Sequence, residues 1–414
     1  MPKTNVIKDE KLVNLFLEGA VDQVLPDKES LRKKLLSGDR VTAYMGFDPT
    51  GPYLHVGHAM GIRALRILQQ LGHRVIFLVG DYTARVGDPD KLSTRELLTT
   101  EKIAENMSGW KDQAAQLIDF DNSDNPVEFR HNFEWLSKLE LEDIIKLMSN
   151  MTVGQMLERD LFRKRIDPDN PIFLQELIYP LMQGYDSVAM NVDLELGGTD
   201  QIFNMMVGRD LVKRYLNKDK WVRANVMMPA PDGITMSKTK GNGINLSDSA
   251  ENMYGVAMSY SDDQIITGLK LLTDMPDSEI KEIENAIDSG ENPMNYKKLM
   301  AFKIVEIIKG EKDAREAQSH FENTIQGSSV SEKRTRISLQ KLDSSLTIKN
   351  KSGDPVTIVS ELISSSKGQA KILLQQNGVE INQKKFKYSG SEKLELQVND
   401  IIKIGKRNWF EIVD

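Results

Sequence analysis

The sequence contains no cysteine, which excludes disulfide bonds and every mechanism that needs a thiol. It has only five histidines, at positions 55, 58, 73, 131 and 320, and the last three are too scattered to complete a zinc site with the first two. No apolar run approaches the ~20 residues that cross a bilayer, and the start MPKTNVIKDEKL shows neither a signal-peptide core nor an arginine-rich transit pattern. We therefore expect a cytoplasmic protein that does not enter the membrane.

Charge is distributed unevenly along the chain. The net charge of -7 argues against a protein that coats nucleic acid uniformly. Residues 347–414 hold 11 lysines and arginines against 8 aspartates and glutamates, so this tail carries about +3 and the rest about -10. A basic tail on an acidic body indicates a separate module with a polyanionic partner, although a chance imbalance on a solvated surface explains the difference equally well.

The segment PTGPYLHVGH at 49–58 places two histidines three residues apart, around a glycine. Residues 41–45 before it and 74–79 after it are typical of buried strands, and 57–71 has apolar residues at helical spacing before Gly72. Such a βαβ unit opens a ligand site at the carboxyl end of its first strand, where a helix N-terminus favours phosphate. His55 and His58 could then donate to a phosphate as it gains charge. The alternative is a plain pair of surface histidines.

Three other segments have polar residues at informative spacing. In YPLMQGYD, Tyr179, Gln183 and Asp186 share one helical face, which is more often a solvated face than a binding site. Pro180 fits that helix only in its first turn. ELGGTDQ at 195–201 is a glycine-rich crossover from strand to helix, and GITMSKTKGNG at 233–243 is a glycine- and lysine-rich loop. No Walker A or dinucleotide fingerprint competes for a nucleotide.

Together these segments resemble the bacterial tyrosyl-tRNA synthetases of class I, along nearly the whole chain. PTGPYLHVGH is similar to the first class I signature, and TMSKT at 235–239 is similar to the second, usually Lys-Met-Ser-Lys-Ser. The resemblance implies an α/β fold: a doubly wound, Rossmann-like catalytic domain over 1–248 with a helical connective insertion at about 90–175. That insertion would bear the dimer interface. An α-helical anticodon-side domain would follow over 249–326. A polar linker over 327–346 would lead to a small α+β RNA-binding module of the S-four type over 347–414, in which we expect two short helices and a hairpin.

The resemblance also implies the reaction and the residues that perform it. The activity would be tyrosine–tRNA ligation through tyrosyl-adenylate, with His55, His58 and Lys238 as catalytic residues. The remaining assignments divide between the two small substrates. L-Tyrosine would be bound by Tyr44, Asp88, Tyr179, Gln183, Asp186 and Gln201. ATP would be bound by Gly46, Asp48, Thr50, His55, Gly57, His58, Gly198, Asp200, Met236, Ser237 and Lys238.

Within the tyrosine pocket, the resemblance gives each end of the substrate its own partners. Tyr179 and Gln183 would bind the ammonium group, with Asp88 as its anionic partner, while Tyr44 and Asp186 would recognise the phenolic hydroxyl. A pocket whose buried polar groups need that hydroxyl rejects phenylalanine by roughly 10⁵, a value for which this enzyme type is itself the standard example. Asp88 sits in an Asp-Pro pair, which is equally an ordinary turn signal.

The expected partners follow from the same resemblance. They are tRNA(Tyr), L-tyrosine, ATP and a second copy of the chain in a homodimer, with Mg²⁺ carried by ATP and no tightly bound metal. The tail lysines are candidate phosphate contacts, though lysines are also default surface residues: Lys367, Lys371, Lys384, Lys385 and Lys387.

One position departs from the family pattern. The second signature usually begins with lysine, and here that residue is Thr235, so the role of the first cation is open. Lys240, Lys91 and Arg95 are candidates to replace it. Three rival interpretations remain at this point: a tryptophanyl synthetase, a small-molecule adenylyl- or cytidylyltransferase, and an RNA-binding relative that has lost activity. The pairing of Tyr44 with Asp186 argues against the first of these.

Overall fold

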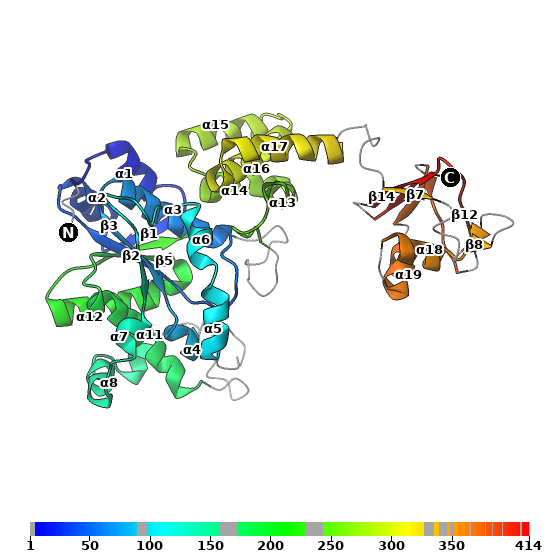
Figure 1. Ribbon diagram of the computed structural model, residues 1–414. Coiled ribbons are helices and arrows are strands. Elements are labelled where there is room, and N and C mark those ends of the chain that lie inside the picture. Colours follow the sequence, from blue (N-terminus) through cyan, green and yellow to red (C-terminus); the bar gives the residue numbers. More distant parts are fainter. Residues whose placement is uncertain are drawn as a thin grey trace. The chain divides into compact units, whose positions relative to one another are not determined.

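The computed structural model describes most of the chain, in two compact units over Met1–Phe321 and Glu322–Asp414 (Figure 1). The described residues are 5–88, 98–157, 172–228, 243–326, 335–338, 346–347, 352–363, 366–376, 378–382, 384–390, 392–405 and 408–413. Among them, no helix is both long enough and apolar enough to span a bilayer.

The first unit is built on a six-stranded sheet with the order β1-β6-β5-β2-β3-β4. All neighbouring strands are parallel except β1, which pairs antiparallel with β6. The strands are β1 (Val21–Leu25), β2 (Thr42–Phe47), β3 (Arg74–Val79), β4 (Glu128–His131), β5 (Leu194–Gly198) and β6 (Trp221–Asn225). The chain runs outward from β2 to β3 and β4, and then returns to place β5 on the other side of β2. The switch point of this doubly wound sheet therefore lies between β2 and β5.

Helices cover both faces of this sheet, and Figure 1 shows α1, α2 and α3 on one side and α11 and α12 on the other. The helices of the sheet region are α1 (Glu10–Leu17), α2 (Lys28–Leu36), α3 (Val56–Gln70), α4 (Thr83–Val86), α5 (Thr100–Met107), α6 (Trp110–Ala115), α7 (Phe133–Leu136), α8 (Leu141–Met148), α9 (Val153–Leu157), α11 (Leu174–Ala189) and α12 (Ile202–Leu216). This α/β architecture confirms the fold class expected from the sequence.

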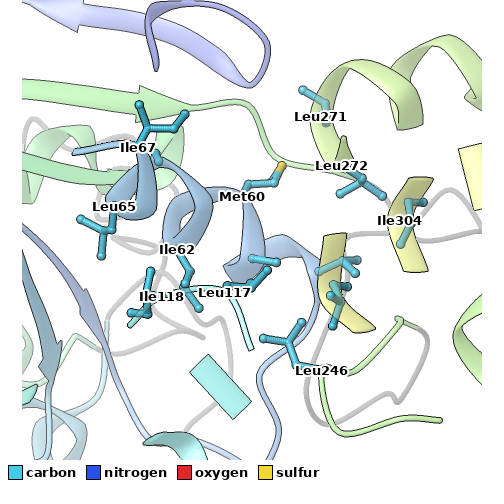
Figure 2. Packing of buried hydrophobic residues seen from close by; sticks show 14 of the residues in the cluster. Met60, Ile62, Leu65, Ile67, Leu117, Ile118, Leu246, Leu271, Leu272 and Ile304 are labelled. Carbon is cyan, nitrogen blue, oxygen red and sulfur yellow. The ribbon is translucent and has the colours of Figure 1, made fainter. Parts of the chain in front are cut away.

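The helix α3 connects the sheet to an all-helical segment that follows it. That segment contains α13 (Ala250–Ala257), α14 (Ile265–Leu272), α15 (Asp277–Asp288), α16 (Pro293–Lys309) and α17 (Glu311–Phe321). Met60 and Ile67 of α3 belong to the same buried cluster as Leu272 and Ile304 (Figure 2). Arg63, also on α3, donates to the Leu271 carbonyl oxygen at 3.1 Å and to the Asp274 carboxylate at 2.7 Å. Apolar packing and a charge-assisted hydrogen bond thus join the helical segment to the helix that begins at His55.

Three features of this unit differ from the sequence expectations. Strand β4 lies within the segment that was expected to be a helical insertion. Its four residues are half-buried and form no apolar run, so no local pattern indicated a strand there. The antiparallel edge strand β1 was not expected at all. Helix α11 begins at Leu174, so Pro180 lies inside it rather than in its first turn. Proline has no amide hydrogen, so the Glu176 carbonyl lacks its usual helical donor there, and packing of α11 against α12 outweighs that loss.

The second unit is α+β, as expected for the tail. Its larger sheet has the order β11-β10-β13-β14-β7, and a smaller one has the order β12-β9-β8. The elements are β7 (Thr335–Ser338), β8 (Leu346–Thr347), β9 (Ser352–Gly353), α18 (Pro355–Leu362), α19 (Lys367–Gln375), β10 (Val379–Ile381), β11 (Lys384–Lys385), β12 (Leu394–Glu395), β13 (Ile401–Ile404) and β14 (Asn408–Val413). The two short helices and the β13–β14 hairpin were predicted.

Strand β7 lies within the segment 327–346 that was expected to be a linker. It pairs in parallel with β14, so Thr335–Ser338 belongs to the sheet of the second unit. Its sequence, TRIS, has one apolar residue in four positions, so no alternation distinguishes it from a polar linker. The pairing, rather than the local pattern, identifies it.

Candidate active site

A cavity of about 570 Å³ lies at the carboxyl ends of β2 and β5, at the switch point of the sheet. Every proposed tyrosine- or ATP-binding residue that the structure describes lines it: Tyr44, Gly46, Asp48, Thr50, His55, Gly57, His58, Asp88, Tyr179, Gln183, Asp186, Gly198, Asp200 and Gln201. Met236, Ser237 and Lys238 lie outside the described residues, as do Thr235, Lys240, Lys91 and Arg95. Chain segments far apart in sequence therefore meet around one space.

The two histidines form the N-terminus of α3. His55 is the N-cap residue, and its Nδ1 accepts from the Gly57 amide at 3.1 Å. His58 Nδ1 accepts from the His55 amide, also at 3.1 Å. A neutral imidazole carries one hydrogen, so an accepting Nδ1 places that hydrogen on Nε2 of both rings. The helix start thus holds two imidazole donors beside its own positive dipole end, an arrangement suited to an anionic phosphate.

Glycine is required where the backbone approaches these groups. A Cβ atom built at Gly57 would lie 2.9 Å from the His55 ring, so any larger residue would displace the cap. At Gly198 a Cβ atom would overlap the Asp200 carboxylate. Glycine at these two positions thus leaves room for the neighbouring side chains.

One end of the cavity holds buried hydrogen-bond acceptors. Asp186 on α11 is only 3% exposed, and it accepts from Trp135 Nε1 at 2.7 Å and from Asn132 Nδ2 at 3.2 Å. Burial raises the pKa of Asp186 well above its usual range, against the opposing effect of these two hydrogen bonds. The Tyr44 hydroxyl lies 2.9 Å from Ser187 Oγ, and burial together with the nearby Glu195 and Asp186 carboxylates raises the Tyr44 pKa. Both side chains reach this end from opposite elements, β2 and α11.

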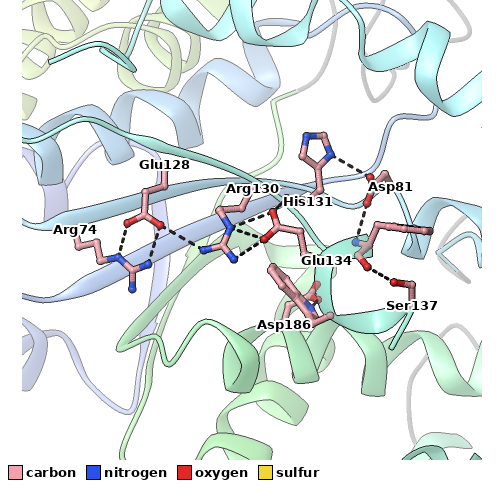
Figure 3. Close-up of polar contacts among 10 residues, drawn as sticks. Arg74, Asp81, Glu128, Arg130, His131, Glu134, Ser137 and Asp186 are labelled. Atoms are coloured by element: carbon pink, nitrogen blue, oxygen red, sulfur yellow. Dashed lines mark hydrogen bonds and ion pairs between the residues drawn. The ribbon is translucent and has the colours of Figure 1, made fainter. Parts of the chain in front are cut away.

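The turn from β4 into α7 is held by ion pairs that fix the two donors to Asp186 (Figure 3). Arg130 bonds to the Glu134 carboxylate at 2.6 Å, and Glu134 also accepts from the His131 amide at 3.0 Å. Asp81, after β3, bonds to His131 Nδ1 at 3.0 Å and accepts from the Phe133 amide. The hydrogen bond to the Asp81 carboxylate raises the pKa of His131. These contacts place the turn between β4 and α7 so that its side chains face Asp186.

The other end of the cavity is acidic. Tyr179 donates to Asp48 Oδ2 at 2.9 Å, and Thr83 Oγ1 donates to Asp48 Oδ1 at 2.8 Å. Gln201 Nε2 donates to Asp88 Oδ2 at 2.8 Å. Burial, followed by the Asp48 and Asp88 charges, raises the pKa of Tyr179 well above its usual value. Two carboxylates with neutral donors around them suit a cationic group, since a buried ammonium needs an anionic partner.

Several residues of the cavity were not expected from the sequence. Asn132 joins the two ends, because its Nδ2 donates both to Asp186 and to Thr83 Oγ1 at 3.0 Å. Glu195 lines the cavity although only 2% of it is exposed. A glutamate at the start of ELGGTDQ, inside an apolar strand, was the available signal. Asn132 and Thr83 gave none, because isolated polar residues in turns are common.

The five tail lysines are placed in the second unit, and all are exposed. Lys367 and Lys371 lie on α19, Lys384 and Lys385 form β11, and Lys387 follows it. Exposed ammonium groups on a small α+β unit are compatible with phosphate contacts and are equally ordinary surface residues.

Comparison with known proteins agrees with this site. The family model for tRNA synthetases class I (W and Y) matches residues 36–326. The chain is 36% identical over 407 residues to the tyrosine–tRNA ligase of Dehalococcoides mccartyi, covering 98% of this chain and 99% of the relative. It is 35% identical over 410 residues to that of Thermotoga maritima, covering 97% of each. A truncated mitochondrial tyrosyl-tRNA synthetase from Aspergillus nidulans shares the fold, with a TM-score of 0.64, 23% identity and coverage of 76% of this chain and 94% of that one. The chain therefore belongs to the class I tRNA synthetases of the tryptophan and tyrosine group, within the tyrosine–tRNA ligases.

Proposed function

We propose that the cavity activates L-tyrosine with ATP and that the chain then transfers the tyrosyl group to the 3' end of tRNA(Tyr). One observation carries the proposal. A single cavity is lined at one end by Tyr44 and Asp186, which can accept from a hydroxyl, and at the other end by the carboxylates of Asp48 and Asp88. The N-terminus of α3, with its two histidines, lines the same cavity. An amino acid with a phenolic hydroxyl and an ammonium group matches both ends. Indole has no hydroxyl for Tyr44 and Asp186, which disfavours tryptophan.

In the first step, a tyrosine carboxylate oxygen attacks the α-phosphorus of ATP. The new P–O bond forms as the bond to the β-phosphate oxygen breaks, which gives tyrosyl-adenylate and pyrophosphate. Asp88, Tyr179 and Gln183 would hold the ammonium group, leaving the carboxylate available for attack. The Nε2 donors of His55 and His58 would stabilise charge that develops on the phosphate oxygens, and Lys238 would stabilise the leaving pyrophosphate. Mg²⁺ would enter as part of the ATP complex.

In the second step, a ribose hydroxyl of the tRNA 3' end attacks the tyrosyl carbonyl carbon and AMP leaves. The exposed lysines of the second unit would contact tRNA phosphates. We assign the catalytic domain to residues 1–248 with its insertion, the anticodon-side helices to 249–326 and the RNA-binding module to the second unit. All substrates of this reaction are available in the cytoplasm, where we place the protein.

A pair of substitutions at His58 tests the role of the helix start. His58→Asn keeps an acceptor near the position of Nδ1, so the contact with the His55 amide survives, but it removes the distal donor. His58→Gln places an amide donor near the position of Nε2. We expect His58→Asn to lower kcat for tyrosine-dependent pyrophosphate exchange by about 10²-fold, and His58→Gln to retain more of the activity. A larger loss in His58→Gln than in His58→Asn would mean that the contact with the His55 amide, rather than the distal donor, matters.

We also propose that the chain forms a homodimer through α8 and α9. Leu141, Ile145 and Met148 follow one another at i, i+4 and i+7 on one face of α8, and they are 73%, 59% and 46% exposed. Val153 of α9, 63% exposed, extends the apolar surface. An apolar face of this kind, within a segment that the family resemblance assigns to the dimer interface, is suited to a second copy.

Light scattering measures this directly. Ile145→Asp places a charge in the centre of the apolar face, and we expect it to halve the molar mass at micromolar concentration. Glu142→Gln, on the same helix but outside the apolar face, should leave the mass unchanged. A dimeric Ile145→Asp variant would place the interface elsewhere, and a monomeric unmodified protein would refute the homodimer.

A further inference from the structure

A buried ion pair lies at the wall of the cavity, and neither step of the proposed reaction uses it. Lys220, just before β6, and Glu195 on β5 have side chains that are 0% and 2% exposed, and the Lys220 ammonium bonds to Glu195 Oε2. Burying two charges is costly, and a simple apolar pair of similar volume often stabilises a fold as well or better. The position of this pair therefore calls for an explanation from its contacts.

Glu195 contacts both parts of the proposed tyrosine pocket. Its Oε1 accepts from Gln183 Nε2 at 3.1 Å, at the part of the cavity assigned to the ammonium group. Its Oε2 accepts from Ser187 Oγ at 3.3 Å, and Ser187 Oγ lies 2.9 Å from the Tyr44 hydroxyl. One carboxylate thus fixes a group at each end of the substrate site. Asn204 Nδ2 donates to the Gln183 carboxamide oxygen at 3.0 Å, which holds that amide with its nitrogen toward Glu195.

Counting hydrogens at Ser187 gives the direction of the Tyr44 bond. Ser187 Oγ has one hydrogen, which goes to Glu195, and it accepts from the Lys220 ammonium at 2.8 Å. Its remaining capacity is one lone pair. The Tyr44 hydroxyl must therefore donate to Ser187, and its own oxygen is left as an acceptor. With Asp186 also accepting, this end of the cavity requires a hydroxyl that donates.

Gly208 on α12 leaves the space that the Lys220 ammonium occupies. A Cβ atom at Gly208 would lie 2.6 Å from Lys220 Nζ, 3.1 Å from Ser187 Oγ and 3.3 Å from Glu195 Oε2. Glycine at this position leaves room for all three groups to meet. A substitution at Gly208 therefore disturbs these three groups without changing any of them.

We infer that Lys220 and Glu195 are positioning residues that hold Gln183 and Tyr44 in the hydrogen-bond directions needed to recognise the two ends of tyrosine. The inference rests on the proposed tyrosine activation. The Lys220 ammonium balances the charge of the Glu195 carboxylate, whose two oxygens accept from Gln183 and Ser187. Without that ammonium, the buried carboxylate has lost its cation and Ser187 has lost one of its donors. Ser187 or Gln183 must then turn, which moves the polar groups at one end of the site.

The test compares four variants in tyrosine-dependent pyrophosphate exchange, with KM for tyrosine, KM for ATP and kcat measured for each. Lys220→Met keeps the length of the side chain without its charge, and Glu195→Gln keeps the shape of the carboxylate. The double variant Lys220→Met/Glu195→Gln has no buried charge at either position. Gly208→Ala leaves the charges of Lys220 and Glu195 in place and crowds the Lys220 ammonium. Melting temperatures show which variants are folded.

We expect Lys220→Met to raise KM for tyrosine by about tenfold or more, with KM for ATP nearly unchanged. Glu195→Gln should also raise KM for tyrosine. The double variant should be less impaired than Lys220→Met, because it leaves no unpaired buried charge. Gly208→Ala should also raise KM for tyrosine.

Two results would overturn the inference. One is an unchanged KM for tyrosine in folded Lys220→Met and Glu195→Gln proteins. The other is an equal rise in KM for tyrosine and in KM for ATP, which would indicate a purely structural role for the pair. Should Lys220→Met fail to fold, Glu195→Gln and Gly208→Ala decide between these results. Failure of the proposed function itself is distinguishable, because the unmodified protein would then show no exchange with tyrosine.

Discussion

Asp186→Asn is expected to lower kcat/KM for tyrosine in pyrophosphate exchange by about 10²-fold and to reduce discrimination against phenylalanine by a similar factor. Trp135 and Asn132 both donate to Asp186, so both carboxylate oxygens must accept. An asparagine places an NH₂ group against one of those donors. Asn132 cannot turn to relieve the conflict, because its Oδ1 already accepts from the Tyr82 amide at 2.9 Å.

The matched control is Trp135→Phe, which keeps an aromatic ring but removes one donor to Asp186. We expect a smaller loss than in Asp186→Asn, because the carboxylate stays and loses only one hydrogen bond. The measurement is kcat/KM for tyrosine and for phenylalanine in parallel. The reference is kcat/KM for ATP, measured at saturating tyrosine. An unchanged ratio between tyrosine and phenylalanine in Asp186→Asn would remove Asp186 from the recognition of the hydroxyl.

Removal of the second unit should separate the two steps of the reaction. In a chain that ends at Gln326, we expect tyrosine-dependent pyrophosphate exchange to stay within about twofold, because the cavity lies wholly in the first unit. Transfer to tRNA should fall by about 10²-fold or more, because the lysine contacts to phosphate are lost. Both activities are measured on the same preparation.

The exact end of the truncated chain matters. A chain that ends at Ser345, the boundary of the linker expected from the sequence, would retain β7 without β14, its partner in the sheet. An unpaired strand invites aggregation and would confuse the result. As a control in the full chain, Lys384→Glu/Lys385→Glu should weaken transfer and reduce its dependence on salt. Undiminished transfer by the truncated chain would refute an RNA-binding role for the second unit.

Local patterns were sufficient to predict the part of the fold that carries the proposed ATP site. The strand at 41–45, the helix after His55 and the strand at 74–79 have short-range signals, and β2, α3 and β3 follow them within one or two residues. The helix face of Tyr179, Gln183 and Asp186 was also local, since residues at i, i+4 and i+7 of any helix lie together. Local spacing did not predict whether that face lies toward the cavity or toward solvent. Only the family resemblance indicated the cavity.

The remaining features depend on contacts that sequence patterns do not contain. Strand β4 is recognised by its pairing with β3, and the donors Trp135 and Asn132 reach Asp186 only because that strand sets the start of α7. Lys220 and Glu195 are 25 residues apart in the sequence, one after α12 and one before it, so no local pattern predicts that they pair. The edge strands β1 and β7 are short and partly polar, so hydrogen bonding to a neighbour decides them rather than their own propensity.

The central claim is that this cavity activates tyrosine. It is tested most directly by exchange of labelled pyrophosphate into ATP, measured with the full chain and with tyrosine, phenylalanine and tryptophan in parallel, because exchange needs no tRNA. The account predicts exchange with tyrosine, with kcat/KM for phenylalanine and tryptophan lower by several orders of magnitude. Exchange with none of the three, or exchange that prefers tryptophan, would contradict it.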